Sequence, residues 1–356
     1  YTELKNYVDL HFFIDEGTHF KTRSITIIGN KKVDASDLIS SFEETKIKKW
    51  WQFWKSGKFD DKKYQDDKKL LIDYYKNHGF IDAEIIKDTI IYDQNEGKVD
   101  ITINVNEGNQ YFIRKINFDG NSVYSNEVLL RRIDIKPGDV YNYGKLKQNL
   151  EANQDQTDAA SLYLDNGYLQ ARLIANEKKV ADDSLDLTIM IFEGTMYKIG
   201  KVDIVGNTKT KDKVIRRELV IKEGELFDSE KMQVSREKVY NLGYFKQVDF
   251  DVRPGTKDGY MNLVVDVEEQ PTGTISLGGG YGSTSGFSIF ADIKENNFMG
   301  NGQTVGVKFE YGPQKSSVTL SFQERWLFDY PVAFNSSVFY YLYQYEDNSI
   351  FPESDE

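Results

Sequence analysis

Apolar and polar residues alternate in three well separated stretches of the first 270 residues. The stretches cover residues 99–105, 185–191 and 261–267, where every second side chain is Val, Ile, Leu or Met. A period of two predicts half-buried strands. Each stretch follows a segment whose inward positions recur at helical spacing instead, such as Leu71, Tyr74 and His78 or Met232, Val239 and Leu242. Helices and strands therefore succeed one another in small groups.

These groups form an internal repeat with a period of about 75 to 90 residues, which is the size of a small domain. Each unit opens with a strand that ends in Gly-Asn, and both residues tolerate the backbone of a turn. The three opening strands lie at residues 25–30, 116–121 and 202–207. A short helix is expected next, at residues 35–42, 126–133 and 211–219.

A second helix then begins at an aromatic residue followed by Asp or Asn, which can accept the free amide hydrogens of a first helical turn. These starts are Phe59-Asp60, Tyr141-Asn142 and Phe227-Asp228. The helix ends at Asn followed by Gly and an aromatic residue, and the glycine is expected to cap it. Two strands close each unit at Glu107-Gly108, Glu193-Gly194 and Glu268-Glu269. Because Glu16-Gly17 has the same form, we expect the end of a further unit at the start of the chain.

The pattern changes after Gln270-Pro271, where helical spacing disappears and glycine-rich alternating segments begin. About five antiparallel strands are expected, near residues 274–277, 287–289, 305–309, 318–322 and 336–345. Apolar residues on one face and Ser, Thr, Gly, Lys or Gln on the other are typical of a membrane barrel with lipid outside. Aromatic residues near the strand ends fit an interfacial girdle. A soluble β-sandwich is the alternative.

The β-α-α-β-β units, with their Gly-Asn turns, Asn-Gly-aromatic helix ends and acidic closing strands, resemble the POTRA repeat of the BamA family of outer-membrane assembly proteins. Residues 295–302 and 325–331 resemble short turns after the first barrel strands of that family. The predicted fold class is α+β, with tandem POTRA domains followed by antiparallel strands of a truncated membrane barrel, since five strands cannot close one. The expected domains are the end of a POTRA repeat at 1–16, POTRA repeats at 17–107, 108–193 and 194–269, and N-terminal strands of an outer-membrane β-barrel at 270–356.

Composition and charge limit which ligands and which kinds of site are expected. With 39% apolar and 29% charged residues, the chain is expected to fold throughout. A net charge of −12 disfavours binding to nucleic-acid phosphates. Cysteine is absent, and three scattered histidines, His11, His19 and His78, lack the spacing of a metal or catalytic site. Gly278-Gly279-Gly280 lacks the Lys-Ser/Thr of a phosphate-binding loop. We therefore expect no catalytic residue, metal or cofactor.

The resemblance implies assembly and insertion of β-barrel proteins into the bacterial outer membrane, with the POTRA repeats in the periplasm. It also implies unfolded outer-membrane protein precursors, accessory lipoproteins and outer-membrane lipid as partners. The alternative is a polypeptide-translocating transporter of the two-partner secretion or TamA-like type. Such transporters carry two or three POTRA units, whereas this chain has three and the end of another.

Three candidate sites follow. The first barrel strand is expected to pair with substrate through Ile275, Ser276, Leu277, Gly278 and Gly279. A strand edge of the first complete repeat is expected to accept a partner strand at Phe80, Ile81, Asp82, Ala83, Glu84 and Ile85. An insertion found only in that repeat carries a candidate partner or membrane contact at Trp50, Trp51, Phe53 and Trp54. The alternative for the last group is packing over its own domain.

Overall fold

The structure is a computed structural model, and it describes residues 20–47, 58–153, 155–282 and 286–344. It contains three small mixed sheets and one larger antiparallel sheet, which confirms the α+β fold class. The chain divides into two compact units. One comprises Tyr1–Ser161 with Arg172–Glu193, and the other comprises Leu162–Ala171 with Gly194–Glu356.

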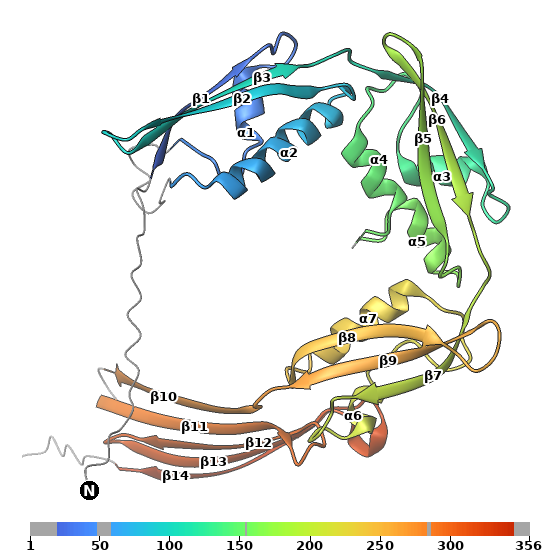
Figure 1. Ribbon diagram of the computed structural model, residues 1–356. Helices are drawn as coiled ribbons and strands as arrows, with labels where there is room; N and C mark the ends of the chain where they lie inside the picture. The colour runs from blue at the N-terminus through green and yellow to red at the C-terminus, as the bar shows by residue number, and fades with distance from the viewer. Residues whose placement is uncertain (1–19, 48–57, 154, 283–285, 345–356) are drawn as a thin grey trace, which may run out of the picture. The chain divides into compact units, whose positions relative to one another are not determined.

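The first repeat is a three-stranded sheet with two helices on one face (Figure 1). Its elements are β1 (Lys21–Ile28), α1 (Ala35–Ser40), α2 (Asp61–Asn77), β2 (Glu84–Asp93) and β3 (Lys98–Asn106). The strand order is β1-β3-β2, with β1 parallel and β2 antiparallel to β3. The helical face of α2 differs slightly from its prediction, because Tyr75 is buried while Tyr74 is only half-buried and His78 is exposed.

The second repeat has the same strand order but one helix more than predicted. Its elements are β4 (Phe112–Asp119), α3 (Asn126–Ile133), α4 (Tyr143–Leu150), α5 (Ala159–Leu164), β5 (Arg172–Ala181) and β6 (Ser184–Phe192). The expected second helix stops because Glu151 takes an extended backbone. Buried Asp158 then accepts the amide hydrogen of Ser161 at 2.8 Å, which gives a new helix its start.

The third repeat comprises β7 (Lys198–Val205), α6 (Asp212–Arg216), α7 (Ser229–Tyr240), β8 (Phe245–Pro254) and β9 (Tyr260–Glu269). Its strand order is β7-β9-β8. The alternating residues of β9 face a closed core, in which Leu263 and Val265 are fully buried. The helix starts predicted in all three repeats are confirmed, since Asp60, Asn142 and Asp228 each accept a first-turn amide hydrogen.

The Asn-Gly-aromatic motif after the last helix of each repeat also joins neighbouring segments. In the first unit, the carbonyl of Gly79 accepts the amide hydrogen of Tyr111 at 2.9 Å, and the Asn77 side chain accepts that of Gly144 at 2.7 Å. In the second unit, the carbonyl of Gly167 accepts the amide hydrogen of Tyr197 at 2.8 Å. One motif therefore both ends a helix and fixes the segment that follows the closing strand.

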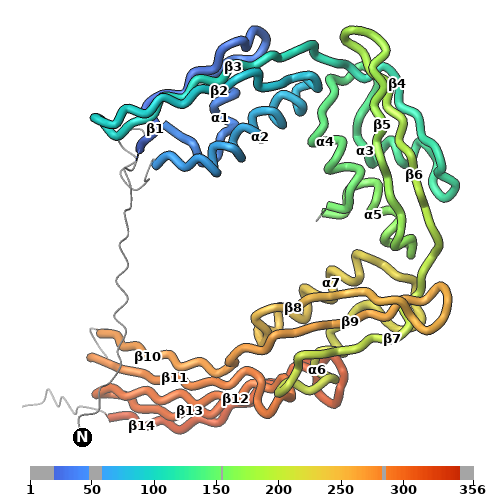
Figure 2. Tube along the Cα trace, in the orientation of Figure 1, coloured from blue at the N-terminus to red at the C-terminus, as the bar shows by residue number. Residues whose placement is uncertain are grey.

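Five strands between Gly273 and Tyr343 form an antiparallel meander, seen side by side in Figure 2. Its strands are β10 (Gly273–Gly282), β11 (Gly286–Phe298), β12 (Gln303–Tyr311), β13 (Lys315–Glu324) and β14 (Phe334–Tyr343). The first four predicted strands each lie within one of these, and the fifth, near 336–345, overlaps β14, with residue 345 outside the described residues. None of the helices in the described part of the chain is long and apolar enough to cross a membrane.

Candidate functional site: strand edges and a docked junction

The predicted edge strand of the first repeat begins later than expected. Strand β2 starts at Glu84, and it lies at the edge of its sheet, paired only with β3 among the described residues. Phe80 and Ala83 are buried because a tight turn, in which the Ala83 amide hydrogen bonds to the Phe80 carbonyl, turns the chain into the core. The edge prediction therefore applies to Glu84 and Ile85, while residues 80–83 precede the strand.

The edge strands of the first and third repeats differ in how many charged residues they expose. Strand β2 exposes Ile86 and Ile91 at 60% each, and a bulge interrupts its pairing at Ile86. Strand β8 exposes charged Asp249 and Asp251 instead, and it ends at Pro254. Charged residues and proline discourage strand addition, whereas exposed apolar residues favour it. By this criterion β2 is a more open edge than β8.

Strand β10, which carries Ile275, Ser276, Leu277, Gly278 and Gly279, is an edge of the five-stranded sheet. It pairs with β11 on one side and with no other described strand. Its glycines are not equivalent, because the Phe290 ring covers Gly278 while the space beside Gly280 is open. The strand thus offers its backbone with few side chains to obstruct it.

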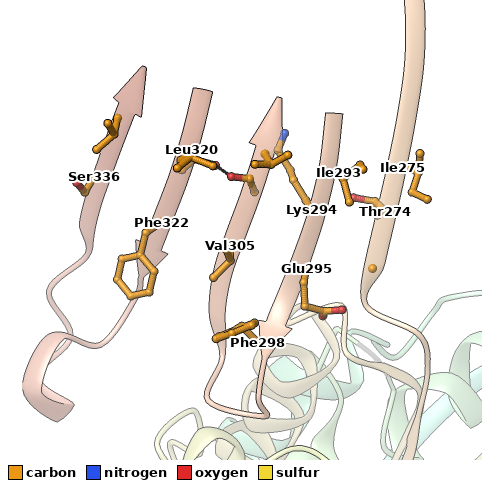
Figure 3. Close-up of a pocket in the computed structure, with 15 residues that line it drawn as sticks. Thr274, Ile275, Ile293, Lys294, Glu295, Phe298, Val305, Leu320, Phe322 and Ser336 are labelled. Carbon is orange, nitrogen blue, oxygen red and sulfur yellow. Dashed lines mark hydrogen bonds between the residues drawn. The ribbon is translucent and has the colours of Figure 1, made fainter. Parts of the chain in front are cut away.

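Cross-strand pairing sorts the sheet into two chemically distinct faces. Ile275, Ile293, Val307, Leu320 and Val338 are successive partners and form one apolar row. The neighbouring row on the opposite face consists of Ser276, Asp292, Lys308, Thr319 and Phe339. The apolar face contains a shallow hollow, shown in Figure 3 with Ile275, Ile293 and Leu320 among its lining residues. Apolar surface of this kind suits acyl chains more than a polar ligand.

Each repeat closes the loop after its first strand with a carboxylate. The acid is the glutamate at the end of the closing strand: Glu107, Glu193 or Glu269. In the third repeat, Glu269 accepts amide hydrogens from Thr208, Lys209 and Thr210. The preceding glycine, Gly206, has a φ of +85°, and a Cβ there would overlap the Val267 carbonyl. The Gly-Asn turn therefore needs glycine for space as well as for conformation.

In the third repeat this clamped loop also holds the turn between β11 and β12. Buried Asn297 donates from Nδ2 to the Thr210 hydroxyl at 2.8 Å and accepts the Gly302 amide hydrogen at 2.8 Å. The Lys211 amide hydrogen bonds to the Gly300 carbonyl at 2.9 Å. Gly300 passes so close to the Lys209 carbonyl that no side chain would fit. The loop and the turn are thus tightly fitted.

The connection between β13 and β14 is attached to the same part of the third repeat. The Trp326 indole donates from Nε1 to Glu218 at 2.9 Å, and the Arg217 guanidinium lies 5.5 Å from the centre of its ring. Lys213 forms an ion pair with Asp329 at 3.3 Å. Trp326, one of the aromatic residues near the strand ends, therefore contacts the third repeat, whereas Phe328 is exposed.

The tryptophan-rich insertion and the three histidines form no site among the described residues. Trp50, Trp51, Phe53 and Trp54 lie outside the described residues, as do His11 and His19. His78 is exposed and stacks on Tyr74. Within residues 20–47, 58–153, 155–282 and 286–344, no cluster of His, Asp and Glu could hold a metal ion.

Sequence reasoning did not foresee the junction around Asn297 and Trp326. Both residues lie in the segments 295–302 and 325–331, which resemble turns of the family, but their partners, Thr210 and Glu218, are about 90 to 110 residues away. One signal was present, because Thr210 is polar where the first two repeats carry Val33 and Tyr124 at the same distance from Gly-Asn.

Comparisons with known proteins agree with this architecture. Residues 20–108, 111–194 and 197–270 match the POTRA family model, described as a surface antigen variable number repeat. Residues 297–354 match the Omp85 superfamily domain. The outer membrane protein assembly factor BamA of Neisseria meningitidis is 28% identical over 90% of this chain and 40% of its own length. That of Neorickettsia risticii is 28% identical over 94% of this chain and 44% of its own length.

Solved structures show the same fold. The crystal structure of BamA from Haemophilus ducreyi lacking POTRA domains 1–3 has a TM-score of 0.59 and 24% identity, covering 68% of this chain and 44% of that one. The POTRA3–5 structure of Haemophilus influenzae BamA has a TM-score of 0.58 and 23% identity, covering 72% of this chain and all of that one. The chain spans about two fifths of the length of these curated BamA relatives.

Proposed function

The chain belongs to the BamA family of outer-membrane protein assembly factors, and from this premise we propose that it helps to assemble and insert β-barrel proteins into the outer membrane. Its location is the bacterial outer membrane, with the POTRA repeats in the periplasm. The substrates in this proposal are unfolded outer-membrane protein precursors.

The proposed mechanism is strand addition to β10. The observation that carries it is that β10 has a partner on only one side among the described residues, in a stretch with three consecutive glycines. An incoming strand would satisfy its backbone groups by pairing there, and those groups cannot remain unpaired in lipid. Recognition would then depend on backbone access more than on the identity of particular side chains.

Two further surfaces support partner binding in this proposal. The exposed edge of β2 would accept a strand from a precursor or from an accessory lipoprotein. The apolar face of the five-stranded sheet, with its row through Ile293 and Leu320, would contact outer-membrane lipid. The free energy for insertion would come from pairing of the substrate strands themselves, so no nucleotide is required.

A polypeptide-translocating transporter is the less favoured function. The BamA relatives from Neisseria meningitidis and Neorickettsia risticii cover at least 90% of this chain, and both are named as assembly factors. Three POTRA matches in sequence also exceed the two units of two-partner secretion pores. Neither the names nor the residues indicate an enzyme.

The test is disulfide crosslinking in the complete membrane-embedded protein. The chain has no cysteine, so Leu277→Cys introduces a single reactive thiol on β10. A precursor that carries one cysteine in its last strand and is stalled during assembly should crosslink to this position. The control is Val318→Cys, which lies on the same apolar face but in a strand paired on both sides.

Strand addition predicts a crosslink at Leu277 and little at Val318, because among the described residues β10 is paired on one side only, whereas β13 is paired on both. Equal crosslinking at both positions would indicate apolar contact without strand pairing and would refute the mechanism. Crosslinking of neither position to any precursor would refute the proposed function.

A further inference from the structure

The pairing of β13 with β14 is weakly specified by its own residues. A shift by two residues keeps every side chain on its original face, because the side-chain period of a strand is two. Leu320 would then meet Ser336 or Tyr340 instead of Val338. Short hairpin turns fix register, but these strands are joined by the longer segment 325–333. Something beyond the strand pattern must select the observed register.

That connecting segment also adopts an unusual backbone. Phe328 and Asp329 have φ values of +55° and +64°, a conformation that few residues other than glycine adopt. Such conformations persist where surrounding contacts hold them. Hydrogen bonds within the segment, such as that from the Leu327 amide to the Val332 carbonyl, hold its internal shape. The third repeat attaches it through the Trp326 to Glu218 hydrogen bond and the Lys213 to Asp329 ion pair.

The third repeat differs from the other two at the residues that make these attachments. Counted from the Gly-Asn turn, Glu218 corresponds to Ser41 and Arg132. At the residue before the first helix, the other repeats have Asp34 and Ser125, whereas the third has Lys211, which donates from Nζ to Asn301 at 2.6 Å. A cation is unfavourable at a helix N-terminus, so this lysine serves the neighbouring turn better than its own helix.

We propose that the third repeat is an internal template that sets the register of the first barrel strands. Its segment 208–218 binds the β11–β12 turn at Gly300 and the β13–β14 connection at Trp326. The pairing of β11 with β12 is irregular between Glu295 and Phe298, next to the first of these turns. With both turns held, this irregularity and the start of β14 are each fixed relative to the neighbouring strand. The repeat therefore acts on its own barrel while the barrel forms, which is distinct from binding a substrate.

The experiment measures register directly by disulfide formation in the complete protein during folding into phospholipid vesicles. The pair Leu320→Cys with Val338→Cys reports the observed register, and Leu320→Cys with Tyr340→Cys reports a two-residue slip. Each pair is combined with Glu218→Ala, which changes the repeat but no strand. Loss of one hydrogen bond to a charged group should lower the ratio of native to slipped disulfide about tenfold.

Two further variants distinguish a change of register from a general folding defect. Trp326→Phe keeps an aromatic ring beside Arg217 but removes the indole donor, so it should shift the ratio as Glu218→Ala does. Glu237→Ala, in the exposed part of α7, should leave the ratio unchanged. If the ratio in Glu218→Ala equals that of the parent protein, the template proposal is wrong. The same conclusion follows if Glu237→Ala shifts the ratio equally.

Discussion

Strands β9 and β10 follow one another in the chain, yet their apolar residues have opposite environments. Leu263 in β9 is fully buried beneath the helices of the third repeat, while Leu277 in β10 is 77% exposed. Both strands alternate apolar and polar residues with a period of two. The alternation itself therefore does not determine what covers the apolar face.

The cover is determined by what lies between the strands. In each repeat, helices separate the first strand from the closing pair and supply an apolar surface to pack against. In the sheet after residue 270 the described connections contain only one short 3-10 turn, Leu327–Asp329, and no α-helix separates the strands. No helix of the described residues covers its apolar face, and lipid is the proposed cover.

The largest expected difference comes from the same Leu→Ala substitution made in β9, before residue 270, and in β10, after it. Leu263→Ala should lower the free energy of unfolding of the third repeat by about 2–5 kcal/mol, because it leaves a cavity in a closed core. Leu277→Ala should change it by less than about 0.5 kcal/mol, since no packing in the repeat is lost. Urea titration followed by hydrogen exchange of the β9 amides measures both. Similar losses would mean that the sheet shares the core of the repeat.

A smaller effect is expected from glycines that differ in their surroundings. Gly206→Ala should destabilise the third repeat by about 1–3 kcal/mol from its positive φ alone, and the overlap with the Val267 carbonyl adds to that. Gly280→Ala meets open space in β10 and should be nearly neutral for the repeat. Thermal unfolding of the two variants makes the comparison. A neutral Gly206→Ala would show that the turn is not tightly fitted.

The smallest effect concerns the carboxylate of Glu269. Although burial opposes its charge, hydrogen bonds from the Thr208 hydroxyl and the amides of Thr210 and Lys209 lower its pKa from the usual 4.5 to about 2. A lowered pKa in the folded state adds stability above pH 4.5, and this stability is lost as the pH falls towards 2. Glu269→Gln should cost about 1–2 kcal/mol at neutral pH, and this cost should shrink steadily as the pH falls towards 2. Melting temperatures measured between pH 7 and pH 2.5 test this, and a constant difference would contradict it.

Much of the fold was accessible from the sequence because its signals are local. Caps at Asp60, Asn142 and Asp228 and the alternation in the closing strands each depend on residues within one turn or one strand. The extra break in the second repeat, where Glu151 takes an extended backbone and buried Asp158 starts a new helix, was missed because the prediction ran a single helix up to the Asn-Gly-aromatic motif. Tyr75 is buried instead of Tyr74 because α2 is rotated slightly about its axis, and residue spacing alone does not resolve so small a rotation.

The candidate sites were harder to predict from the sequence, since they depend on residues that are far apart in the chain. The pattern identified β10 as a first strand, but it did not place Phe290 over Gly278. It recognised the segment around Trp326 without linking it to Glu218. Such links follow from how a repeat and a sheet pack together, and no spacing within either segment encodes that.

The bond from Gly144 to Asn77 has an electrostatic consequence. It brings the C-terminal end of α2 against the first turn of α4, so the partial negative end of one helix faces the partial positive end of the next. The two peptide dipoles attract, and dissolved ions screen such attraction over about 10 Å at 0.1 M salt. The first two repeats are therefore coupled by a field as well as by contact, and that coupling should loosen as ionic strength rises.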